Sequence, residues 1–190
     1  FVLMRIISGK YKGRRITAPK KLPVRPTTDL AKESLFNILN NHFYLDEISL
    51  LDLFSGTGNI SYEFASRGCE TITAVDADYG CTAFIKKTAK EFDFNISIIK
   101  SDVFKFLEKV KIEANIIFAD PPYDFSDEKF ANISTLVFKN KILAENGYLI
   151  IEHSSHTNLS HLEYFSHSKK YGGCVFSFFE HPDTDTSEEE

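Results

Sequence analysis

The sequence of 190 residues has no tryptophan, only one methionine and three cysteines, and it contains no long apolar run. A membrane span needs about 18 or more apolar residues, so we expect no membrane association. The cysteines, at positions 69, 81 and 174, are odd in number and unrelated in spacing. This pattern disfavours a disulfide framework or a zinc site and indicates reduced thiols in a cytoplasmic protein.

Positive charge is scarce over most of the chain and concentrated at its beginning. Residues 1–32 carry nine Lys or Arg and one acid, a net charge of +8, whereas the remainder carries −13. A basic arm on an acidic body favours a polyanionic partner, most simply a nucleic acid, but charge alone fits a solvated face equally well.

Prolines separate this basic segment from the rest of the chain. Residues 4–16 read as two short strands around a glycine-containing turn, which predicts a β-hairpin. Pro19, Pro23 and Pro26 then indicate an extended connector. We expect three parts: a hairpin with its connector (1–26), one globular domain (27–181) and an acidic, disordered tail (182–190).

Strand-like and helix-like segments alternate through the central domain. We expect strands over residues 48–54, 71–75, 96–99, 116–119, 147–152, 162–166 and 174–180. Expected helices span 56–67, 78–92, 103–110 and 128–138, after a first helix that starts around Thr27-Thr28-Asp29 and ends near 40–42. Such alternation predicts an α/β fold with a doubly wound parallel sheet, closed by the last two strands as an antiparallel edge.

The tetrapeptide Asp120-Pro121-Pro122-Tyr123 directly follows one of the buried strands. Prolines fix φ and lack N–H groups, so their carbonyls are free acceptors on a stiff loop. A carboxylate beside such a carbonyl can accept both hydrogens of a planar amino group, and the tyrosine ring can stack on the ring that carries it. We therefore interpret all four residues as catalytic residues that hold an aromatic amine, with a simple strand-ending turn as the alternative.

A glycine-containing turn, Asp52-Leu53-Phe54-Ser55-Gly56-Thr57-Gly58, closes the first strand of the domain. Glycines at a strand-to-helix turn let the backbone approach a ligand closely at the helix N-terminus. The dinucleotide fingerprint requires a third glycine where this chain has Ser61, which argues against NAD or FAD.

Acids follow the next two strands. Asp76, with Ala77 after it, can accept hydrogen bonds from ribose hydroxyls, and Asp102, with Val103 after it, from an adenine amino group. Taken separately, each aspartate is more simply explained as a helix N-cap, but their combination with the glycine turn and Asp120–Tyr123 is more specific. Glu152-His153-x-x-His156 contains the residues of a metal motif in the wrong order, and we interpret it as structural.

These motifs together resemble the class I S-adenosylmethionine-dependent methyltransferases, and Asp-Pro-Pro-Tyr resembles the signature of those that methylate exocyclic amino nitrogens of bases. Over about residues 4–180 the chain is similar to the ribosomal RNA small-subunit methyltransferase D family. Leu30 and Lys32 stand where that family usually has arginines. The matching segments are Met4-Arg5-Ile6-Ile7-Ser8-Gly9, Gly13-Arg14, Arg25-Pro26-Thr27-Thr28-Asp29, Glu33-Ser34-Leu35-Phe36-Asn37, Asp52–Gly58 and Ser66-Arg67-Gly68.

The resemblance implies a Rossmann-like, seven-stranded methyltransferase sheet, S-adenosyl-L-methionine as cofactor and no metal. It implies methyl transfer to the exocyclic N2 of one guanine in bacterial 16S rRNA, free or in the 30S subunit, by a cytoplasmic protein that we expect to be monomeric. The implied cofactor contacts are Asp52, Phe54, Ser55, Gly56, Thr57, Gly58, Asp76, Ala77, Asp102 and Val103. The resemblance also implies that Arg5, Lys10, Lys12, Arg14, Arg15, Arg25 and Thr27 bind the RNA partner. A DNA adenine-N6 methyltransferase, a nicotinamide-dependent dehydrogenase and a non-catalytic RNA-binding module remain as alternatives.

Overall fold

The computed structural model describes residues 1–25 and 27–183 of the chain. Pro26 of the expected connector and residues 184–190, most of the expected acidic tail, therefore lie outside the described residues. Within residues 1–25 and 27–183, no helix is both long enough and apolar enough to cross a membrane.

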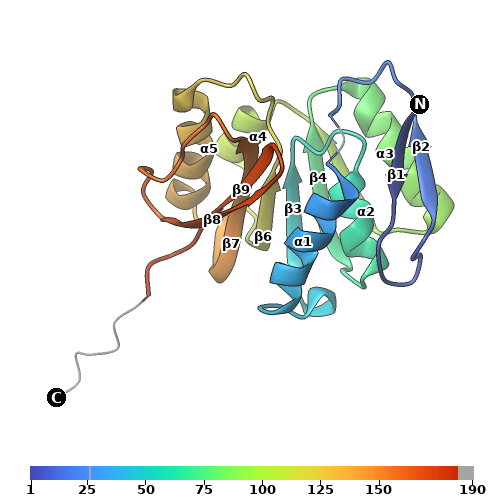
Figure 1. Ribbon diagram of the computed structural model, residues 1–190, viewed down its shortest axis with the longest axis horizontal. Helices are drawn as coiled ribbons and strands as arrows, with labels where there is room; N and C mark the ends of the chain where they lie inside the picture. The colour runs from blue at the N-terminus through green and yellow to red at the C-terminus, as the bar shows by residue number, and fades with distance from the viewer. Residues whose placement is uncertain (26, 184–190) are drawn as a thin grey trace.

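A seven-stranded sheet runs through the molecule in the order β5-β4-β3-β6-β7-β9-β8 (Figure 1). The strands are β3 (Ser49–Leu53), β4 (Thr71–Asp76), β5 (Ile96–Lys100), β6 (Ala114–Ala119), β7 (Leu143–Ser154), β8 (Phe165–Tyr171) and β9 (Cys174–Phe179). Strands β3 to β7 are parallel, and β9 pairs antiparallel with both β7 and β8. The predicted parallel sheet with an antiparallel edge is thus confirmed.

Helices cover both faces of the sheet because alternate strand residues point to opposite sides. In β6, Ile116 and Phe118 belong to the core beneath α1 and α2, whereas Ile117 and Ala119 belong to the core beneath α4 and α5. A short 3-10 turn, Leu45–Glu47, leads from α1 to β3. The helices are α1 (Asp29–Asn40), α2 (Asn59–Ser66), α3 (Tyr79–Phe92), α4 (Val103–Lys109) and α5 (Asp127–Lys139).

The predicted N-terminal hairpin is present as β1 (Val2–Arg5) and β2 (Arg15–Ala18), which pair antiparallel. It lies beside α3 at one end of the molecule, opposite the β8–β9 edge (Figure 1). Its turn fits closely against α2: Gly9 has φ +86°, and a Cβ there would lie 1.9 Å from the Ser66 carbonyl oxygen. Only glycine allows both that φ and that approach.

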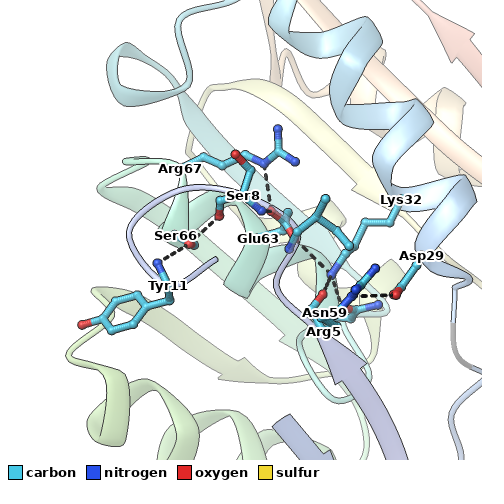
Figure 2. A network of polar contacts seen from close by, with 10 residues as sticks. Arg5, Ser8, Tyr11, Asp29, Lys32, Asn59, Glu63, Ser66 and Arg67 are labelled. Carbon is cyan, nitrogen blue, oxygen red and sulfur yellow. Dashed lines mark hydrogen bonds and ion pairs between the residues drawn. The ribbon is translucent and has the colours of Figure 1, made fainter. Parts of the chain in front are cut away.

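A buried ion network holds the hairpin to α1 and α2 (Figure 2). The Glu63 carboxylate accepts hydrogen bonds from the amides of Ile7 and Ser8, at 2.8 and 3.1 Å. Lys32 Nζ lies 3.1 Å and Arg67 Nε 2.8 Å from the same carboxylate. Lys32, one of the two departures from the resembled family's pattern, is therefore an interior residue that joins three segments of the chain.

Several predicted boundaries were wrong, and two of these errors have an identifiable reason. The helix expected from residue 56 begins at Asn59, because Gly56 and Gly58 have φ of +54° and +89°, outside the right-handed helical region. Strand β7 begins four residues before the expected Gly147. Strand β8 starts at Phe165 instead of residue 162, since its exposed, polar sequence is held by pairing with β9 and carries little local signal.

Candidate active site

A cleft of about 540 Å³ opens where β3, β4 and β6 end, at the point where the strand order reverses. Open α/β sheets bind ligands at this point, and the volume falls within the range of about 300–1,000 Å³ typical of small-molecule sites. The predicted site residues that line it are Arg25, Thr27, Asp52, Phe54, Ser55, Gly56, Thr57, Asp76, Ala77, Asp120, Pro121, Pro122 and Tyr123. Two motifs more than sixty residues apart in sequence thus share one cleft.

The glycine turn bends sharply around the end of β3. Phe54 has φ +54°, an uncommon and strained value for a residue with a side chain. At Gly58 a Cβ would lie 2.6 Å from the Tyr62 ring, so both conformation and space require glycine. The amide of Gly56 donates to Asp76 Oδ2 at 2.9 Å, which ties this turn to the end of β4.

Polar groups with unused bonding capacity line this half of the cleft. The Ser55 hydroxyl is buried and has no partner among the described residues. Asp52 is buried and accepts a hydrogen bond of 2.6 Å from Ser61, and its burial raises the pKa of this carboxyl to about 7. Burial also raises the pKa of Asp76, which accepts from the amides of Gly56 and Asp78.

The other half of the cleft is built on Asp120 and Tyr123 after β6. Arg25 from the connector reaches into it, with Nη2 2.9 Å from Asp120 Oδ1 and the guanidinium carbon 3.2 Å from the centre of the Tyr123 ring. Burial, and then the neighbouring Glu152 carboxyl, raise the pKa of Asp120 well above its ordinary value, against the opposing charge of Arg25. The prediction had Arg25 on an RNA backbone, whereas here it lies on the tetrapeptide that we predict to be catalytic.

Glu152 does not itself line the cleft, but it contacts Arg25 and Thr27, which do, and the sequence interpretation missed it. It lies near the end of β7, buried, with Thr27 Oγ1 at 3.2 Å, Cys174 Sγ at 3.3 Å and Arg25 Nη2 at 3.8 Å. The signal was available, because Glu152 is an acid at the end of a parallel strand, as Asp76 and Asp120 are. Its neighbour His153 is buried against the Ser177 hydroxyl, consistent with a structural histidine.

Three predicted cofactor residues are not brought to the cleft. Asp102 is exposed and caps α4, accepting from the Lys105 amide at 3.0 Å, as a helix N-cap does. Val103 is buried in the core beneath α4. Gly58 shapes the turn but does not line the cleft. A cofactor role for these residues stays a prediction.

The hairpin cations lie outside the cleft and largely in solvent. Arg5 pairs with Asp29 at 3.0 Å, with both side chains half exposed. The Lys10 ammonium lies 5.4 Å from the Tyr11 ring centre. Arg14, Arg15 and Lys12 are exposed, and Arg14 lies over the Phe92 ring. They are available to a polyanion, and their contact with RNA stays a prediction.

Solved structures of other proteins share this fold. An RNA methyltransferase from Salinibacter ruber, solved with S-adenosyl-L-homocysteine, has a TM-score of 0.65 at 15% identity over 87% of this chain and all of that one. The hypothetical protein TTHA0928 of Thermus thermophilus has a TM-score of 0.80 at 22% identity, covering 93% of this chain and 99% of that one. A protein described as Putative methyltransferase yhhF, from Escherichia coli, has a TM-score of 0.79 at 25% identity, covering 94% of this chain and 97% of that one. Together with the relative described next, fold and site define the class of Rossmann-like, S-adenosylmethionine-dependent methyltransferases.

Within this class the sequence is more specific. Residues 4–180 match the family described as Conserved hypothetical protein 95, and the chain belongs to that family. It is also similar to a protein named Ribosomal RNA small subunit methyltransferase D from Buchnera aphidicola subsp. Baizongia pistaciae (strain Bp). The two are 32% identical over 156 residues, which is 82% of this chain and 78% of the relative.

S-adenosyl-L-methionine is the cofactor of the class, and the residues of this cleft fit its chemistry. The unpartnered Ser55 hydroxyl and the Asp52 carboxyl suit an amino-acid group, and Asp76 has lone pairs left for ribose hydroxyls. Phe54 and Phe125, whose rings meet edge to face at 5.5 Å, offer an apolar wall for a flat base.

Proposed function

We propose that this protein transfers the methyl group of S-adenosyl-L-methionine to the exocyclic N2 of a guanine in 16S rRNA. One observation carries the proposal: Asp120, the stiff Pro121–Pro122 segment and the Tyr123 ring share one cleft with residues Phe54–Thr57 of the glycine turn. We call Asp120, Pro121, Pro122 and Tyr123 the base seat, because together they could bind an aromatic amine. The base seat adjoins the residues proposed to bind the cofactor. The name of the Buchnera relative supports ribosomal RNA of the small subunit as the polymer.

In this mechanism the protein positions the amine. The Asp120 carboxylate and the Pro121 carbonyl accept the two N2 hydrogens while Tyr123 stacks on the base, which turns the nitrogen lone pair out of conjugation. When bound, the cofactor supplies an activated methyl group. The nitrogen loses one proton as it gains the methyl group, and Asp120, whose pKa is raised, is placed to take that proton.

The target base reaches this seat only after leaving its stack, because a stacked base hides N2 from a protein cleft. The exposed cations of the hairpin would then hold the RNA backbone, and such contacts position the polymer without reading its sequence. We place this reaction in the cytoplasm and assign it to a monomer.

The test is methyl transfer from labelled S-adenosyl-L-methionine to unmodified 16S rRNA, 30S subunits and duplex DNA, followed by nucleoside analysis. We expect N2-methylguanine in RNA and a loss of about 10²–10⁴-fold in Asp120→Ala, the typical contribution of a positioned acid–base group. Asp124→Ala, which removes an exposed acid four residues further on, is the matched control. N6-methyladenine in DNA, or full activity in Asp120→Ala, would refute the proposal.

A further inference from the structure

Arg25 occupies the seat that the proposed function gives to the target base. Its planar guanidinium lies on the Tyr123 ring, 3.2 Å from ring centre to carbon, and one amino nitrogen donates to Asp120 at 2.9 Å. The same nitrogen lies 3.8 Å from Glu152 Oε1. A stacking ring and two carboxylates therefore surround one flat group that bears several N–H donors.

The guanidinium has the same donor pattern as one edge of guanine. Guanine presents an N1–H and an N2 amino group on adjacent positions of a planar ring, and a guanidinium likewise presents N–H donors side by side in a plane. Adenine has an unprotonated N1 beside its amino group, which is a hydrogen-bond acceptor. Two neighbouring carboxylates can accept hydrogen bonds from both N1–H and N2 of guanine. Facing adenine, one carboxylate would instead meet the unprotonated N1, another acceptor, and be repelled by it.

Glu152 has bonding capacity left for such an edge. A carboxylate offers about four acceptor positions, and among the described residues this one contacts a hydroxyl, a thiol, a distant cation and the neighbouring Asp120 carboxyl. No backbone amide donates to it among the hydrogen bonds of the described residues. Burial raises the pKa of Glu152, a sign that its charge is incompletely compensated.

We propose that Glu152 is the specificity-determining residue of the base seat: when the base displaces Arg25, Glu152 accepts the N1 hydrogen of guanine while Asp120 accepts from N2. This inference rests on the proposed function and adds the group that separates guanine from adenine. The displaced Arg25 is then free to pair with an RNA phosphate, which reconciles its position here with the contact predicted from sequence.

Nucleoside binding tests the seat without any methyl transfer. The Arg25→Ala protein, saturated with S-adenosyl-L-homocysteine to block the cofactor site, is titrated by NMR with guanosine, 2-aminopurine riboside and inosine. 2-Aminopurine keeps the amino group but lacks N1–H, and inosine keeps N1–H but lacks the amino group. We expect 2-aminopurine riboside to bind about ten- to hundredfold more weakly than guanosine, the worth of a hydrogen bond to a charged group.

Adding Glu152→Gln should abolish that difference, because an amide can either accept from N1–H or donate to an unprotonated N1. The weaker binding of inosine should persist in Glu152→Gln, since the amino group is held by Asp120. Glu145→Gln, an exposed glutamate at the other end of β7, is the control and should leave all three affinities unchanged.

Three results would overturn the inference. These are equal binding of guanosine and 2-aminopurine riboside to Arg25→Ala, an equal weakening of all three nucleosides by Glu152→Gln, or no guanosine binding up to its solubility. Failure of methyl transfer to RNA, with the nucleoside pattern as expected, would instead refute the proposed polymer and leave the seat intact.

Discussion

Glu63 and Glu152 are both buried glutamates, with exposed fractions of 0% and 2%, but their surroundings differ in the kind of partner they supply. Glu63 receives two backbone amides and lies within 3.1 Å of both Lys32 and Arg67 (Figure 2). Burial alone would raise the pKa of Glu63, but the Ile7 amide and the Lys32 and Arg67 cations outweigh it, and the pKa is lowered.

Glu152 shows the opposite balance. Burial raises its pKa, and the Cys174 thiol, Arg25, Thr27 and the neighbouring Asp120 carboxyl offset this only in part. A buried charge that is fully paired stabilises its ionised form, whereas one that is incompletely paired retains affinity for a further donor. The comparison teaches that the kind of partner, at equal burial, separates a structural glutamate from a candidate binding group: Glu63 has two amides and two close cations, whereas Glu152 has a hydroxyl, a thiol, a distant cation and a second carboxyl.

The largest effect should come from Glu63→Gln. The substitution leaves the buried Lys32 ammonium without its main counter-charge, and breaking a buried ion pair from one side costs about 3–5 kcal/mol. Denaturant unfolding should show this loss, while Glu145→Gln at an exposed position should change stability little. A loss below about 1 kcal/mol would mean that the network contributes little to holding the hairpin.

Removing the cation as well should recover part of that loss. In the double variant Lys32→Met with Glu63→Gln, no uncompensated ammonium remains, and we expect about 1–2 kcal/mol to return, within the range seen for contacting pairs. Burial lowers the pKa of Lys32 even in the intact network, which shows how strongly this site depends on its anion. Additive losses in the double-mutant cycle would contradict a direct coupling between the two residues.

Glu152→Gln should change stability less, and with a distinct pH dependence. A carboxyl whose pKa is raised in the folded state costs stability as the pH rises from its ordinary value of 4.5 through the raised one. The variant lacks this cost, so its stability relative to the parent should increase above about pH 4.5 and level off below it. Urea unfolding from pH 4 to 8 would measure this, and the reverse slope would show that Glu152 is better paired than its contacts indicate.

The sequence predicted the order of strands and helices because apolar runs and helical periodicity are local signals. It also predicted that Asp120–Tyr123 and the turn after β3 share one site, because the carboxyl ends of neighbouring parallel strands lie at the same edge of the sheet. The start of α2 was predicted three residues early, because positive φ at Gly56 and Gly58 is not visible in composition.

The position of Arg25 was beyond local prediction. The connector path is set by tertiary contacts, such as Val24, whose Cγ1 lies 3.0 Å from where a Cβ on Gly56 would stand. Prolines indicate an extended chain but not the direction in which it runs. Glu152, by contrast, could have been predicted. Applying to the last parallel strand the strand-end rule that identified Asp76 and Asp120 would have identified it.

The exposed cations of the hairpin should contribute much less to stability than the buried Glu63 network, and more to RNA binding. Arg14→Ala with Arg15→Ala should cost less than about 1 kcal/mol of stability, the worth of the exposed contact between Arg14 and Phe92. RNA affinity should fall, and the slope of log K against log salt should shrink by about 1.4 for two phosphate contacts on single-stranded RNA. Affinity for S-adenosyl-L-methionine should not change, since neither arginine lines the cleft.

The control is Lys169→Ala with Lys170→Ala on β8, at the opposite end of the molecule, which removes the same charge. An equal loss of RNA affinity in this control would mean that net charge, and not the hairpin, attracts the RNA.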